Sequence, residues 1–70
     1  MSLYPILRRE LDKTGISVSF LATELDLTED SIRNKLDGKA PWMLSEALRI
    51  SRLLNFSDIK LLFLQFDNNS

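Results

Sequence analysis

The sequence predicts an all-α domain of five short helices, and three observations lead to that fold class. Apolar residues recur at spacings of three and four, as they do along one face of a helix. Only two Gly and two Pro interrupt the chain, and they stand between these stretches or at the start of one. No stretch alternates apolar and polar residues in the way of a half-buried strand. We therefore expect residues 1–70 to form a single helical domain.

The first expected helix runs from Pro5 to Thr14. Proline is favoured in the first turn of a helix, and Gly15 can end the helix in a left-handed conformation. Leu7 and Leu11 lie one turn apart and are expected to face the core, with Leu3 one turn earlier. The residues expected to face outward are Arg8, Arg9, Asp12 and Lys13.

The second and third helices are each preceded by a residue whose hydroxyl can cap the helix. Ser17 is expected to cap a helix that ends near Asp26, and its inward residues are Leu21, Ala22 and Leu25. Thr28 is expected to cap the third helix, which continues to Leu36 and ends at Asp37-Gly38. Its expected buried residues are Ile32 and Leu36, and its first turn carries Glu29 and Asp30.

The last third of the chain predicts a loop and two more helices. The loop covers residues 39–43, and the Trp42 ring is expected to anchor it on the core. The fourth helix is marked by a line of apolar and small residues, Leu44, Ala47, Leu48, Ser51 and Leu54, and ends at Asn55. Ser57 is expected to cap a fifth helix, with Asp58 at its start, that is apolar almost all round from Ile59 to Phe66.

The composition excludes several kinds of functional site. The chain has no Cys and no His, so it has no disulfide, no cysteine or histidine metal ligand and no imidazole base. No spacing of its carboxylates suggests a catalytic pair. We therefore expect no enzyme activity, no cofactor and no small-molecule ligand. We also expect a cytoplasmic protein, because neither a leader pattern nor an apolar run of about 18 residues is present.

Residues 17–37 combine the features of a helix-turn-helix. Two helices that cross steeply through a tight turn must approach closely, and the small Ala22 on the inner face permits this. The turn needs a residue that tolerates a positive φ, and Asp26 is one of the few non-glycine types that does so. Leu27 then follows as a core residue, and Ile32 is expected to hold the third helix against the second.

The sequence from Tyr4 to about Phe63 resembles the phage repressor/Cro-like (XRE-type) helix-turn-helix family. The resemblance is carried by Gly15-Ile16-Ser17, Leu21-Ala22, Leu25-Asp26-Leu27-Thr28-Glu29, the run from Ile32 to Lys39, and Leu44-Ser45-Glu46-Ala47-Leu48. It implies a five-helix DNA-binding domain in which the third helix, residues 28–36, enters the major groove while the second crosses the DNA backbone.

The resemblance also implies which residues contact DNA. They are Ser17, Thr28, Glu29, Asp30, Ser31, Arg33, Asn34, Lys35 and Lys39. Asn34 can pair with adenine, Arg33 can reach guanine or a phosphate, and Glu29 and Asp30 can accept from cytosine. Ser17, Lys35 and Lys39 are candidate phosphate contacts. Glu29 and Asp30 have a second interpretation as partners of the helix dipole, and Arg33, Asn34 and Lys35 as a solvated helix face.

Two features depart from that family. Val18 stands where the family usually has a Gln that contacts a phosphate and braces the third helix. The formal charges between Thr28 and Lys39 sum to zero, and the whole chain carries 9 Lys+Arg against 10 Asp+Glu, a net charge of −1. Binders of nucleic acid are usually basic, so we expect little non-specific affinity for DNA.

The expected function is that of a sequence-specific transcriptional regulator that binds a pseudo-palindromic double-stranded DNA site. The alternative is a protein-interaction module derived from the helix-turn-helix. The segment 58–66 also has two interpretations: it closes the core, or it forms a homodimer interface. The residues assigned to that interface are Ile59, Leu61, Leu62, Leu64 and Phe66.

Overall fold

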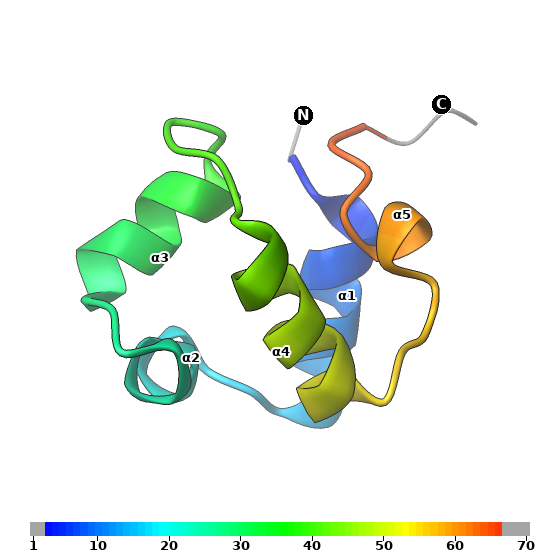
Figure 1. The fold of residues 1–70 in the computed structure, drawn as a ribbon, viewed down its shortest axis with the longest axis horizontal. Helices are drawn as coiled ribbons and strands as arrows, with labels where there is room; N and C mark the ends of the chain where they lie inside the picture. The colour runs from blue at the N-terminus through cyan, green and yellow to red at the C-terminus, as the bar shows by residue number, and fades with distance from the viewer. Residues whose placement is uncertain (1–2, 67–70) are drawn as a thin grey trace.

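The computed structural model describes residues 3–66, which form five α-helices and no strand in that range. The helices are α1 (Pro5–Thr14), α2 (Val18–Leu25), α3 (Glu29–Leu36), α4 (Leu44–Leu54) and α5 (Ile59–Leu62). The first four expected helices are confirmed. Figure 1 shows α4 at the centre, α1 and α5 next to each other on its right, and α2 and α3 together on its left.

The core lies between the five helices, each of which contributes buried side chains. Its fully buried residues are Leu7, Leu21, Ile32, Ile50 and Leu62. The expected inward residues of α1, α2 and α3 lie on or against this core. A 70-residue domain has little apolar surface to bury, so each of these side chains carries a large share of the stability.

Four of the five helices end in one and the same backbone arrangement. At the end of α1, Gly15 adopts a φ of 73°, the Gly15 N–H donates to Asp12 O, and the Ile16 N–H donates to Leu11 O. This is the Schellman arrangement, in which a left-handed residue lets two amides satisfy the last carbonyls of the helix. It recurs after α2, α3 and α4, with the left-handed residues Asp26, Gly38 and Asn55.

The buried face of α4 differs from the line expected from the sequence. Its buried residues are Ala47, Ile50, Ser51 and Leu54, whereas Leu44 and Leu48 are 70% and 37% exposed. The helix is rotated so that the Ile50 and Leu54 side chains face the core. Leu44 and Leu48 therefore form an apolar ridge on the adjoining, solvent-facing side of α4.

The fifth helix is shorter than expected and has a different cap. It covers only Ile59–Leu62, and the Asp58 carboxylate, not the Ser57 hydroxyl, accepts from the Leu61 N–H. After the helix the chain turns back toward the start of α1, where Gln65 pairs with Tyr4. The Tyr4 N–H donates to Gln65 O at 3.0 Å, and the Gln65 amide donates to the Tyr4 hydroxyl at 3.2 Å.

Three aromatic rings close the core at this end of the molecule. Tyr4, Trp42 and Phe63 pack edge to face, with ring centroids 5.6–6.4 Å apart. Trp42 thus anchors its loop on the core, as expected from the sequence, and the rings give the loop, α1 and the segment after α5 a common contact.

Candidate functional site

The turn between α2 and α3 has the conformation that a tight helix pair requires. Asp26 adopts φ 56° and ψ 46°, and the Leu27 N–H donates to Ala22 O at 2.8 Å. Ala22 is buried where the helices approach, as expected for a small residue. Figure 1 shows α2 nearly end-on and α3 side-on, so the two axes cross steeply. α3 packs mainly against α2, and this leaves its opposite side open.

Both helices of this pair begin with the expected side-chain cap. The Ser17 hydroxyl accepts from the Phe20 N–H at 3.0 Å, and the Thr28 hydroxyl accepts from the Ser31 N–H at 3.1 Å. Each cap leaves other first-turn amides without a partner in the helix, and such amides can hold an anionic oxygen. Val18, at the first position of α2, is half-buried and packs against the core.

The outer face of α3 is formed by residues opposite its buried line. Ile32 and Leu36 point into the core, and Asn34 lies on the other side of the helix. Asp30, one turn before Asn34, has a side chain that is 92% exposed. The side chains farthest from the core on α3 are therefore the Asp30 carboxylate and, one turn later, the Asn34 amide.

Arg33 is held by the two carboxylates that precede it on α3. Its guanidinium lies 3.1 Å from Glu29 Oε1 and 3.5 Å from Asp30 Oδ1. All three side chains are about half exposed or more, so each pair contributes little to stability. Their effect is on charge: the arginine that was expected to reach DNA already has two anionic partners.

Lys35 is turned away from the outer face of α3. Its ammonium lies 2.9 Å from Glu46 Oε1, donates to Pro41 O at 2.9 Å and sits 5.8 Å from the centre of the Trp42 ring. Its side chain is only 12% exposed. Lys35 thus ties the end of α3 to the loop and to α4, and its charge is satisfied inside the protein.

Glu46 is the second half of that connection. Burial raises the pKa of its carboxyl, but the Met43 N–H, which donates to it at 2.9 Å, and the Lys35 ammonium together hold that pKa below its ordinary value. Glu46 occupies the third position of α4, where a carboxylate can cap the helix start. Glu46 was not among the expected site residues; a Glu three residues after an N-cap is one half of the capping-box pattern, but Met43 lacks the hydroxyl of the other half.

Arg8 forms a second tie between α3 and the rest of the molecule. Its guanidinium donates to Leu3 O at 2.7 Å, to Leu36 O at 3.0 Å and to Asp37 Oδ1 at 3.3 Å. The Arg8 side chain is 38% exposed and so reaches the surface as expected, but its guanidinium is engaged there by the Leu36 carbonyl and the Asp37 carboxylate at the end of α3. No periodicity in the sequence places the end of α3 beside α1.

The expected DNA-contacting residues therefore fall into two groups. Those with exposed side chains are Ser17, Thr28, Glu29, Asp30, Arg33, Asn34 and Lys39, whereas Ser31 and Lys35 are half-buried. Lys39 follows the left-handed Gly38 and carries an exposed cation at the end of α3. Lys39 forms no ion pair within residues 3–66, in contrast to Arg33 and Lys35.

The residues assigned to a dimer interface also differ in how exposed they are. Leu62 is fully buried in the core, Ile59 and Leu64 are half-buried, and Leu61 and Phe66 are 40% and 52% exposed. The segment thus closes the protein's own core, which was one of its two interpretations. Leu61 and Phe66 remain exposed, as do Leu44 and Leu48 on α4.

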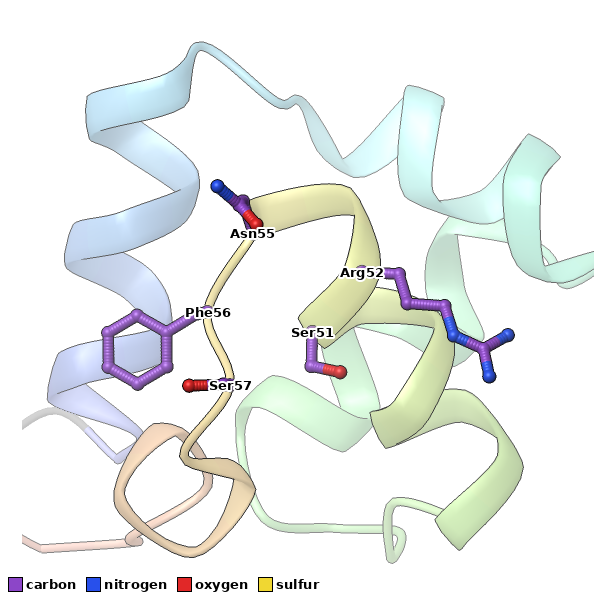
Figure 2. A pocket seen from close by; sticks show the side chains of 5 residues that line it. All are labelled: Ser51, Arg52, Asn55, Phe56 and Ser57. Atoms are coloured by element: carbon purple, nitrogen blue, oxygen red, sulfur yellow. The ribbon is translucent and has the colours of Figure 1, made fainter.

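Two open hollows lie in the surface of residues 3–66, and one of them is lined by Glu24, Leu25, Asp26, Ser45, Glu46 and Arg49. Figure 2 shows the other one, which is lined by Ser51, Arg52, Asn55, Phe56 and Ser57. The Arg52 and Phe56 side chains extend in opposite directions, and the Ser51 hydroxyl already donates to Leu48 O. Within residues 3–66 no three His, Cys, Asp or Glu side chains gather as metal ligands would. No helix in this part of the chain is long and apolar enough to cross a membrane.

Comparison of the chain with known proteins found no matching family model, no matching curated protein and no matching solved structure.

Proposed function

We propose that this protein is a sequence-specific DNA-binding transcriptional regulator of the phage repressor/Cro-like helix-turn-helix type. In this proposal α3 enters the major groove and α2 crosses the DNA backbone. We place this function in the cytoplasm.

The observation that carries this proposal is the way α3 is held. Asp26 sets its entry from α2, Lys35 ties it to α4, and Arg8 binds the carbonyl of its last residue. These contacts all lie behind or beside the helix, so its outer face stays free. A helix that contacts base edges must be held in a fixed position and must have an open face with short polar side chains.

The proposed contacts follow from exposure and chemistry. Asn34 and Asp30 lie outermost and are the proposed base readers, with Thr28 and Ser31 beside them at the start of α3. Ser17 and the first-turn amides of α2, together with Lys39, are the proposed phosphate contacts. Lys35 is assigned a positioning role because its ammonium is satisfied by Glu46.

A single α3 spans few base pairs, so we propose that the protein binds a pseudo-palindromic site as a homodimer. A two-fold pair places the two reading helices about one DNA turn apart. Leu61 and Phe66 are the assigned interface residues whose side chains are exposed. Sedimentation at micromolar concentration tests this, and a monomer on DNA as well as in solution overturns it.

The test of the DNA function is selection from a random pool of duplexes at low salt. We expect one enriched, two-fold related sequence, and its affinity should fall steeply as salt rises, because each phosphate contact releases counterions. If no duplex is retained at low salt, the DNA function is wrong.

A second candidate function is favoured by the pairing of the α3 cations. Both Arg33 and Lys35 are bound to carboxylates, and the α4 ridge exposes Leu44 and Leu48. A helix-turn-helix scaffold with these features can serve as a protein-interaction module without DNA. Such a module should bind its partner with little dependence on salt, because apolar contacts are not screened.

A further inference from the structure

Both cations of α3 are paired with carboxylates of the protein, and the outermost line of side chains on this helix consists of Asp30 and Asn34. Lys35 is engaged by Glu46, and Arg33 is engaged by Glu29 and Asp30. The most exposed of these charged side chains is Asp30, at 92%. Asn34 follows one turn later on the same line. This arrangement differs from a helix that attracts DNA through free positive charge.

We infer that α3 selects base edges that carry exocyclic amino groups and that its carboxylates suppress binding to generic DNA. This inference rests on the proposed DNA-binding function and specifies what that surface recognises. The ligand class is a duplex site in which adenine N6 or cytosine N4 amino groups face Asp30 and Asn34.

The chemistry of the major groove supports this choice. Adenine N6 and cytosine N4 are its hydrogen-bond donors, whereas guanine N7 and O6 and thymine O4 are acceptors. An ionised carboxylate only accepts hydrogen bonds, so Asp30 can bind an amino group but is repelled by guanine O6 or a phosphate. The Asn34 amide both accepts and donates, which fits the N6 and N7 edge of adenine.

The same groups account for weak binding to other sequences. Generic DNA affinity depends on free Lys and Arg near the phosphates. Glu29 and Asp30 are both within ion-pair distance of the Arg33 guanidinium, and residues 29–33 carry a formal net charge of −1. A duplex without a well-placed amino group therefore meets repulsion that no hydrogen bond offsets.

The experiment compares the unmodified protein with Asp30→Asn and with a matched control, Asp12→Asn. Both variants remove one exposed carboxylate on a helix and keep the side-chain shape, but Asp12 lies on α1, away from the outer face of α3. Each protein is titrated with the duplex selected from the random pool and with a scrambled duplex of equal length, at low and moderate salt. Circular dichroism confirms the fold of each variant.

We expect Asp30→Asn to raise the affinity for the scrambled duplex and to reduce the ratio of selected to scrambled affinity about tenfold. Asp12→Asn should change both affinities by the same small factor. A second arm replaces each adenine and cytosine of the selected half-site by an analogue without the exocyclic amino group. The unmodified protein should lose about tenfold or more at one or two positions.

The possible results separate a failure of this inference from a failure of the DNA-binding function. If the protein binds the selected duplex but Asp30→Asn leaves the ratio unchanged, or no amino group matters, this inference is wrong while the DNA function stands. If neither the unmodified protein nor Asp30→Asn retains any duplex, the DNA function fails and the inference fails with it.

Discussion

The Lys35 ammonium and the Glu46 carboxylate lie 2.9 Å apart, with side chains only 12% and 14% exposed, and they join the end of α3 to the start of α4. Each has further partners: Lys35 donates to Pro41 O, and Glu46 accepts from the Met43 N–H. A charge in such a half-buried place is stable only while its partner is present. The pair therefore makes the position of α3 dependent on two residues outside its outer face.

Loss of the Lys35–Glu46 pair should lower the free energy of unfolding more than loss of the exposed Arg33 pairs on α3. We expect Lys35→Met to lower the free energy of unfolding by about 2 kcal/mol, because the Glu46 carboxylate loses a charged donor. Arg33→Met, which removes only exposed ion pairs, should cost about 0.5 kcal/mol or less. Urea unfolding measures both. Equal losses for the two variants would contradict the assignment of Lys35 as the structural cation.

The same carboxyl predicts how stability depends on pH. The pKa of Glu46 is lowered in the folded protein, so its contribution is present at neutral pH and is lost as the pH falls below its ordinary value of 4.5 and through the folded pKa. Glu46→Gln should be less stable than the unmodified protein at pH 7 and should show a shallower loss between about pH 5 and pH 3. Parallel curves of unfolding free energy against pH would overturn this.

The sequence predicted the helices well because their ends are coded locally. Ser17 and Thr28 are hydroxyl caps, and Gly15, Asp26 and Asn55 are residue types that tolerate a left-handed conformation. Each of these signals depends only on neighbouring residues. The ends of α1, α2 and α4 and the starts of α2 and α3 followed from them without any knowledge of tertiary contacts.

The remaining features depend on contacts between distant residues. α5 ends at Leu62, although the apolar run continues, and Gln65 then pairs with Tyr4. Arg8 reaches the end of α3, and Lys35 reaches Glu46. A Lys or Arg on a helix gives the same local signal whether it faces DNA, water or a carboxylate. The charge pairing of the candidate site was therefore not predictable from spacing.

At the left-handed helix ends, substitution by alanine and substitution by glycine should change the free energy of unfolding in opposite directions. Gly15 has a φ of 73° and nothing lies within 4 Å of an added Cβ, so Gly15→Ala tests backbone strain alone and should cost about 1 kcal/mol. Asn55→Gly should be neutral or stabilising by up to about 1 kcal/mol, since Asn55 adopts a φ of 52°. Thermal or urea unfolding of both variants measures this, and a loss in Asn55→Gly would contradict it.

The contact between Arg8 on α1 and the end of α3 can be tested by comparing variants of Arg8 and of its neighbour Arg9. Arg8→Met removes hydrogen bonds to Leu3 O and Leu36 O and should cost about 1–2 kcal/mol. Arg9→Met removes an ion pair at 3.7 Å to the buried Glu10 carboxylate but no hydrogen bond, and should cost less, about 0.5–1 kcal/mol. Both changes remove one positive charge, so net charge does not explain a difference. Equal unfolding free energies for the two variants would show that the Arg8 contacts add nothing.

Asn34 and Lys39 separate base reading from phosphate binding on the proposed DNA surface. Asn34→Ala should weaken binding to the selected duplex by about 1–3 kcal/mol and relax its preference at one base position, because only base contacts carry sequence information. Lys39→Ala should weaken binding to selected and scrambled duplexes equally and should reduce the slope of log affinity against log salt by about 1, since it removes one phosphate contact. Titration of both duplexes over a salt series measures these effects. A uniform loss in Asn34→Ala would show that Asn34 reads no base, and an unchanged salt slope in Lys39→Ala would show that Lys39 lies outside the DNA interface.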